Sequence, residues 1–298
     1  MFSLYNLVFY KRYTNCYITV SSWKILIIMK KLIKGLREFK TTYVSSHQQL
    51  FEQLSQGQKP RVLFITCSDS RVDPNLITQA QLGELFVIRN AGNIIPPYGA
   101  TNGGEGATIE YAIQALGIRQ IIVCGHSHCG AMKGLTKLHS LDEEMPLVHD
   151  WLKYTEATRL LAKEHYSHYK GEELLEIITA ENVLTQIENL RTYPVIRSKL
   201  YQNQLYIYAW IYQIETGEVL AYDPETHSYV SPQSLLSYLP DDEIVLGYHS
   251  NGNGTKTSSD GQTTTESEEV VFDTYQGFPM TRLSKAQIER IYRGSATN

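Results

Sequence analysis

The stretch "EGATIEYAIQALGIRQIIVC" (residues 105–124) predicts a helix followed directly by a strand. Its first part places apolar residues on one side of a helix, and Gly117 is a residue type that commonly ends one. The run "QIIVC" is short, β-branched and continuously apolar, which is typical of a strand covered on both faces. A similar run, "LFVI" (residues 85–88), precedes the helix. The order strand, helix, strand predicts a parallel sheet with right-handed crossovers.

Segments on either side extend this pattern. "RVLFIT" (residues 61–66) predicts another buried strand, and residues 205–223 hold two apolar runs around "ETGE", which predict a hairpin or a final strand pair. Apolar residues at helical spacing occur over residues 32–39, 47–57, 147–163 and 172–190, and Pro194 interrupts or restarts the last of these helices. We therefore expect an α/β fold with a mostly parallel central sheet flanked by helices.

Composition divides the chain into four parts. The apolar run "WKILIIM" within residues 1–29 is far shorter than the roughly twenty residues that span a bilayer. Because "MKKLIKGLREFK" looks like a natural bacterial start, we expect residues 1–28 to be an upstream extension or a disordered tail. The main folded domain is expected at residues 29–246. Residues 247–275 are polar and glycine-rich, as in a flexible linker, and residues 276–298 are expected to bind a partner.

Charge and cysteine content exclude several classes of protein. The formal net charge is -4, from 27 basic and 31 acidic residues, so no overall field would concentrate nucleic acid or anionic lipid. The 4 cysteines are too few and too scattered for a disulfide framework, which favours a reducing compartment. We expect no nucleic-acid or membrane partner, and sulfur chemistry that involves thiolates.

Two polar clusters follow predicted strands. "CSDSRVDP" (residues 67–74) places Cys67 directly after one strand, and "GHSHCGAMKG" (residues 125–134) places His126 and Cys129 directly after another. Functional residues of an open parallel sheet gather beyond the carboxyl ends of its strands, so we expect the two loops to meet. Two thiolates and an imidazole suit zinc and suit magnesium or calcium poorly. Three protein ligands leave a fourth position open, as in catalytic zinc sites.

Other interpretations of these residues have less support. Cys67 and Cys129 could be small buried hydrophobic residues with His126 as a helix cap. A Cys–His nucleophile pair would leave the other cysteine and Arg71 without a role. A Walker loop requires Ser or Thr after glycine-lysine, whereas Gly134 follows the lysine here, and the glycines lack the dinucleotide-binding spacing.

Asp69 and Arg71 are expected to act beside the open metal position. The Asp69 carboxylate can accept a hydrogen bond from hydroxide at that position, or it can bind the metal itself and close the site. The planar guanidinium of Arg71 can hold the carboxylate bidentately and keep it off the metal. The alternative is a surface ion pair unrelated to the metal, which would contribute little stability.

Several motifs together carry a family resemblance, namely "CSDSRVDP", "GELFVIRNAGNIIPP", "GGEGATIEYA" and "GHSHCGAMKG". They closely resemble those of the β-class carbonic anhydrases, and the resemblance covers residues 32–223. It implies a zinc enzyme that interconverts carbon dioxide and bicarbonate, with one zinc per subunit. The ligands that it implies are Cys67, His126 and Cys129, and it implies that Asp69 is paired with Arg71. It also implies a homo-oligomer built from dimers, with active sites near the dimer interface. The pocket residues that it implies are Gln58, Phe86, Tyr111 and Gly130.

The C-terminal part indicates which members of the family the chain resembles. "VLTQIENLRTYP" (residues 183–194), the polar linker and "AQIERIYRGS" (residues 286–295) look similar to cyanobacterial members of the family that reside in carboxysomes. There a C-terminal extension recruits the enzyme to a scaffold protein, which implies a location in the cytoplasm within the carboxysome and supply of CO2 to Rubisco. Ile288, Ile291 and Tyr292 lie at i, i+3 and i+4, the spacing of one apolar helix face that a groove could bind. The segment could instead pack on its own domain.

Two alternative functions would use the same residues. The scaffold could hydrolyse carbonyl sulfide or carbon disulfide. A zinc site closed by Asp69 would instead make the chain a scaffold or bicarbonate-responsive binding module. The intact pair of Asp69 and Arg71, together with Gln58, favours the anhydrase.

Overall fold

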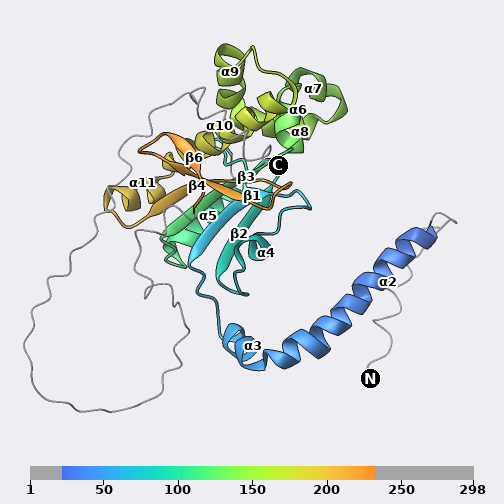
Figure 1. Cartoon of the computed structure of the whole chain (residues 1–298). Helices are drawn as coiled ribbons and strands as arrows, with labels where there is room; N and C mark the ends of the chain where they lie inside the picture. The colour runs from blue at the N-terminus through green and yellow to red at the C-terminus, as the bar shows by residue number, and fades with distance from the viewer. Residues whose placement is uncertain (1–21, 102, 233–298) are drawn as a thin grey trace, which may run out of the picture. The chain divides into compact units, whose positions relative to one another are not determined.

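The computed structural model describes residues 22–101 and 103–232, with side chains from residue 27 onward (Figure 1). The chain divides into two compact units, Met1–Gln58 and Lys59–Asn298. The predicted linker and partner-binding segment, including Ile288, Ile291 and Tyr292, lie outside the described residues.

The first unit is helical in its described part. Helix α2 (Ser22–Glu38) continues into the π-helical segment η1 (Phe39–Val44), and α3 (Gln48–Ser55) follows. These elements cover both predicted N-terminal helices, and α2 begins ahead of Met29. Apolar side chains of α2 are exposed, Leu36 among them. Across the described residues, no helix is both long enough and apolar enough to cross a membrane.

The second unit is built on a 6-stranded sheet within the described residues. Its strands are β1 (Val62–Cys67), β2 (Leu85–Asn90), β3 (Gln120–His126), β4 (Tyr206–Tyr212), β5 (Val219–Asp223) and β6 (Ser228–Val230). Their spatial order is β2-β1-β3-β4-β5-β6. All neighbours from β2 to β4 are parallel, whereas β5 is antiparallel to both β4 and β6. The predicted mostly parallel sheet is confirmed, and β6 is a strand that the sequence reasoning missed.

Two strands end later than predicted. Cys67 is the last residue of β1 and His126 the last residue of β3, so neither is the first residue of a loop. The neighbouring strands explain the difference, because Cys67 pairs with Asn90 of β2 and His126 pairs with Tyr212 of β4. Strand pairing therefore holds the backbone of both residues.

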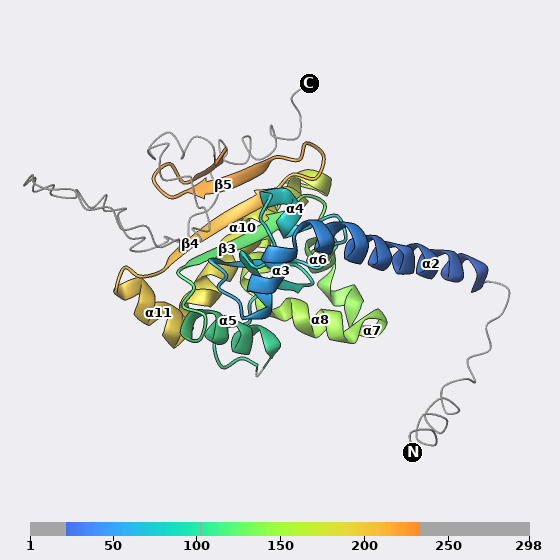
Figure 2. The ribbon, with the colours of Figure 1, turned by 90° about the horizontal axis from the view of Figure 1, so that it is seen from below.

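Helices connect and flank the strands, as expected for this fold class. After α4 (Pro74–Thr78) and α5 (Gly104–Gln114), which follow β1 and β2, the chain forms α6 (Gly130–Leu135), η2 (Leu138–Ser140), α7 (Leu141–Glu144), α8 (Pro146–Leu152), η3 (Lys153–Thr155), α9 (Glu156–His165), α10 (Gly171–Arg191) and α11 (Pro194–Tyr201). Both views show α6, α7 and α8 grouped together (Figure 1 and Figure 2). The helix predicted over residues 147–163 is divided by the 3-10 turn η3, and Pro194 starts α11.

The main core lies between the sheet and α10. Ile65 of β1 and Val123 of β3 belong to one fully buried cluster with Val183 and Ile187 of α10. Burial of such side chains contributes roughly 1.5–3 kcal/mol each. A second buried cluster contains Cys67 and residues of α6, α8 and α10. The carboxyl end of β1 is therefore packed against helices at Cys67.

Candidate active site

The three predicted ligands come together at the carboxyl end of the sheet. Cys67 ends β1, His126 ends β3, and Cys129 is the N-cap residue of α6. Because β1 and β3 are adjacent parallel strands, their ends lie side by side. The ligand atoms of the three residues lie within 4.8 Å of one another, and all three side chains are buried. The structure thus brings both predicted loops to one site.

The His126 ring has the hydrogen bonding of a metal ligand. Its Nδ1 lies 2.8 Å from the backbone oxygen of Ser127, which can only accept, so Nδ1 carries the proton. In the neutral ring this leaves a lone pair on Nε2. The Nε2 atom is buried and has no hydrogen-bond partner among the residues that the structure describes. Buried polar atoms are almost always satisfied, so this orphaned nitrogen fits a bound cation.

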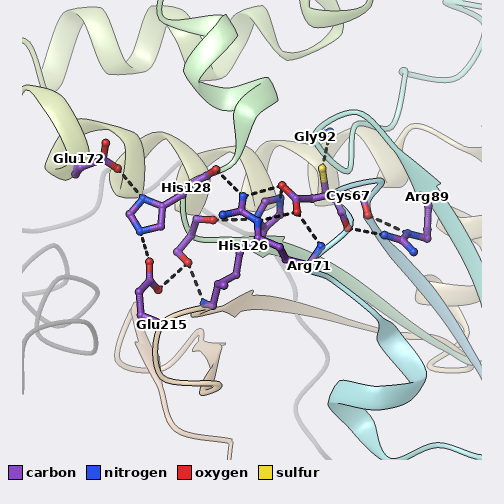
Figure 3. Close-up of polar contacts among 11 residues, drawn as sticks. Cys67, Arg71, Arg89, Gly92, His126, His128, Glu172 and Glu215 are labelled. Atoms are coloured by element: carbon purple, nitrogen blue, oxygen red, sulfur yellow. Dashed lines mark hydrogen bonds and ion pairs between the residues drawn. The ribbon is translucent and has the colours of Figure 1, made fainter. Parts of the chain in front are cut away.

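The two sulfurs complete a donor set suited to zinc. The Cys129 thiol donates to Cys67 and lowers the pKa of Cys67 well below its usual value, while the same contact raises the pKa of Cys129. The backbone N–H of Gly92 also donates to Cys67 Sγ over 3.4 Å (Figure 3). Two sulfurs and one imidazole nitrogen match zinc. Cys124 stands apart, because it is buried in another apolar cluster with Phe64 and Ile122.

The loop that follows β2 is held where it meets Cys67. Trp151 of α8 donates from Nε1 to the Ala91 oxygen over 2.8 Å. The Gly92 N–H of the same peptide group donates to Cys67 Sγ. Asn182 of α10 donates from Nδ2 to the Gly92 oxygen over 3.0 Å. The donor to Cys67 is therefore positioned by side chains of two helices.

Asp69 and Arg71 form the predicted pair beside the cluster. Arg71 donates from Nε to Asp69 Oδ1 over 2.9 Å and from Nη2 to Oδ2 over 2.8 Å. Its backbone N–H donates to Oδ1 as well. These bonds hold the pKa of the Asp69 carboxyl well below its usual range, so the group is a carboxylate at neutral pH. Its Oδ2 lies 3.9 Å from His126 Nε2, which places an acceptor at the ligand cluster.

Arg89 is a site residue that the sequence reasoning missed. It donates from Nε to the Cys67 oxygen over 3.1 Å and from Nη2 to the Asp69 oxygen over 2.7 Å (Figure 3). Arg89 thereby holds the backbone of the loop that carries Asp69. The available signal was an arginine directly after the apolar run "LFVI" in the strand "LFVIRN".

The model of the carbonic anhydrase family matches residues 62–219, which is more than half of the chain. The chain belongs to this family. A carbonic anhydrase of Synechocystis sp. is 58% identical over 275 residues, covering 90% of this chain and 100% of that relative. The solved structure of the β-carbonic anhydrase CcaA has 67% sequence identity and a TM-score of 0.68, covering 68% of this chain and 99% of that one. The class is therefore the β class.

A more distant solved structure agrees on the fold. Crystal structures of two tetrameric β-carbonic anhydrases from Sordaria macrospora include a chain with 26% sequence identity and a TM-score of 0.57. The match covers 65% of this carbonic anhydrase and 96% of that chain. The likeness thus spans nearly the whole of the fungal chain.

Two predicted pocket residues of this carbonic anhydrase lie away from its ligand cluster. Phe86 of β2 pairs with Leu63, four positions before Cys67, which corresponds to about 13 Å along the strand. Tyr111 of α5 contacts Phe86, with ring centroids 6.1 Å apart, and is 51% exposed. Within one chain the two aromatic residues form a separate pair, and their role in a pocket stays a prediction.

The other two predicted pocket residues belong to different units of the chain. Gly130 directly follows Cys129 as the first residue of α6 and is exposed, so it lies beside the ligand cluster. Gln58 is the exposed last residue of the first unit, whereas the cluster belongs to the second unit. The part played by Gln58 also stays a prediction.

Proposed function

We propose that this carbonic anhydrase interconverts carbon dioxide and bicarbonate at one zinc ion per subunit, held by Cys67, His126 and Cys129. The observation that carries the proposal is the buried cluster of two sulfurs and an unpartnered imidazole nitrogen within 4.8 Å. Zinc in such a site supplies Lewis-acid activation of water at near-neutral pH.

The residues of the chain would perform the remaining tasks. The Ser127 backbone oxygen sets the tautomer of His126 by accepting a hydrogen bond from its Nδ1–H, which leaves the lone pair on Nε2. Arg71 occupies Asp69 Oδ1 with two donors and Oδ2 with one. A carboxylate oxygen has room for more than one donor, so Oδ2 can also accept a hydrogen bond from the water that attacks carbon dioxide. The clamp keeps Asp69 oriented toward that water and off the metal.

The test combines zinc content with kinetics. The full chain should contain one zinc per subunit and hydrate CO2 in stopped-flow assays, with little hydrolysis of carbonyl sulfide or carbon disulfide. Asp69→Asn should keep its zinc and lose at least about a hundredfold in kcat/KM, because an amide presents its N–H₂ to Arg71 or to the water. Glu188→Gln, at a half-buried position of α10 where the carboxylate pairs with Arg191 and not with the site, serves as the control. An active Asp69→Asn enzyme would argue against the assigned role.

We further propose that the enzyme acts inside the carboxysome and supplies CO2 to Rubisco, with the C-terminal segment binding a scaffold protein. What supports a role for the C-terminal part is that the Synechocystis carbonic anhydrase shares it, since coverage of 90% of the chain must extend well beyond the described catalytic unit. Removal of residues 284–298 should release the enzyme from isolated carboxysomes and leave its specific activity unchanged. Retention in carboxysomes after the deletion would contradict the proposal.

We also propose a homo-oligomer built from dimers. The tetrameric relatives from Sordaria macrospora support an assembled enzyme. So do the exposed apolar side chains of α2, including Ile28, Leu32 and Leu36, which lack a cover within one chain's described residues. Light scattering of the full chain should give a mass that is an even multiple of the 34.0 kDa subunit.

A further inference from the structure

The segment between the proposed metal ligands is held by the hairpin that joins β4 to β5. Ser127 donates from Oγ to Glu215 Oε2 over 2.8 Å, and it accepts at Oγ from the backbone N–H of Ile214 over 2.9 Å. Its own N–H donates to the Tyr212 oxygen over 3.0 Å. The other Glu215 oxygen, Oε1, contacts His128 Nε2 as an ion pair (Figure 3). One carboxylate therefore contacts two consecutive residues of this segment.

A second carboxylate holds the same segment from the opposite side. Glu172, in the first turn of α10, has its Oε2 2.7 Å from His128 Nδ1. His128 has φ 52, in the left-handed region that non-glycine residues rarely adopt. Both ring nitrogens of His128 are thus occupied by acidic side chains from distant parts of the chain, which hold an otherwise unfavourable backbone conformation.

The conformation of His128 matters because its carbonyl points to the catalytic pair. The His128 oxygen accepts from Arg71 Nη2 over 3.3 Å, and the same Nη2 donates to Asp69 Oδ2. The Arg71 side chain is 45% exposed, so few contacts other than these restrain its guanidinium. A shift of the His128 carbonyl would remove one of them.

We propose that Glu215 is a positioning residue of this enzyme, which holds Ser127 and His128 so that the His128 carbonyl anchors Arg71 against Asp69. The proposal rests on the proposed roles of Asp69 and Arg71 in catalysis. Glu215 touches neither a ligand atom nor Asp69 in the contacts described above, so it acts through His128 and Arg71. Glu172 supports the same residue from α10.

The hairpin offers a matched control. Glu218 is exposed in the same hairpin, and its carboxylate contacts Thr216 rather than the ligand segment. Glu215→Ala and Glu218→Ala therefore remove the same charge from neighbouring positions, and only the first removes the contacts to Ser127 and His128.

The decisive measurement is a double-mutant cycle on the zinc-loaded full chain. Glu215→Ala should lower kcat/KM for CO2 hydration by about tenfold in the wild-type background and by less than about twofold when Arg71→Lys is already present. Glu218→Ala should change it in neither background. Equal losses from Glu215→Ala in both backgrounds would show that Glu215 does not act through Arg71, and no loss at all would equally overturn the proposal.

A structural readout complements the kinetics. Hydrogen–deuterium exchange at the Ser127 amide, which is protected by Tyr212, should become faster in Glu215→Ala and stay unchanged in Glu218→Ala. Unchanged exchange in Glu215→Ala would contradict the proposed hold on the segment. If Glu215→Ala fails to fold, Glu215→Gln keeps the side-chain size and the same cycle applies. An inactive wild-type enzyme, or an Arg71→Lys enzyme of full activity, would instead overturn the proposed function on which the inference rests.

Discussion

Gly92 is a residue at which one added methyl group should disturb the site. It has φ +84, and a Cβ built on it would lie 2.9 Å from both Ala131 Cβ and Met132 Cε. Met132 can move the end of its side chain, whereas Ala131 Cβ is attached to the backbone of α6. That helix begins directly after Cys129, and Gly92 itself donates to Cys67 Sγ. Gly92→Ala therefore strains two of the proposed ligand positions together.

The size of the effect follows from two contributions. Alanine in a left-handed conformation costs about 1–2 kcal/mol. Overpacking against α6 adds about 1–3 kcal/mol, so the free energy of unfolding should fall by about 2–5 kcal/mol in Gly92→Ala. Gly99 provides the matched control, because it has φ +81 and nothing within 4 Å of a built Cβ. Gly99→Ala should cost only the backbone contribution, about 1–2 kcal/mol.

Urea unfolding of the zinc-loaded full chain, followed by tryptophan fluorescence at one protein concentration, measures both variants. The transfer of zinc to a chelator measures the effect on the site, and it should be faster in Gly92→Ala than in Gly99→Ala or the wild type. Equal destabilisation of the two variants would refute the reasoning, since the contact with α6 would then contribute nothing.

Three further substitutions test other parts of the structure. Trp151→Phe removes the donor to the Ala91 oxygen and keeps most of the apolar packing, so it should lower the free energy of unfolding by about 0.5–1.5 kcal/mol in urea titrations. His126→Ala should purify without stoichiometric zinc by elemental analysis, whereas Cys124→Ala should retain it, because Cys124 lies outside the ligand cluster. Burial raises the pKa of the Cys124 thiol from 9.0 to about 12, so above pH 9 the unfolded chain releases a proton that the folded chain keeps. Stability should therefore fall as pH rises through this range, and Cys124→Ala should show a shallower fall in urea titrations; an identical slope would count against burial as the cause.

The sequence was sufficient for the sheet and the ligand cluster because both depend on local patterns. Continuous apolar runs such as "QIIVC" are needed only where both faces of a strand are covered, and this is how β1 and β3 are buried. Residues at the carboxyl ends of adjacent parallel strands must lie together, so Cys67 and His126 could be paired before their distance was known.

The residues that support the site could not be found in this way. Asn182 lies on α10, which is buried on most sides, so its polar side chain does not follow an amphipathic pattern. Its partner is the Gly92 oxygen, and only the tertiary structure determines that contact. The same holds for Arg89 and Glu215, whose partners are backbone or side-chain atoms of segments distant in the sequence. Periodicity describes which face of an element is covered, but not which polar atoms meet there.

The position of the ligands on two strands and a following helix has a consequence for biosynthesis. Cys67 is translated well before His126 and Cys129, and α4, β2 and α5 separate the two ligand-bearing segments. Until β3 pairs with β1, Cys67 stays apart from His126 and Cys129, so the nascent chain lacks the cluster of all three side chains. A metal ion held by all three proposed ligands would therefore bind after these strands have paired.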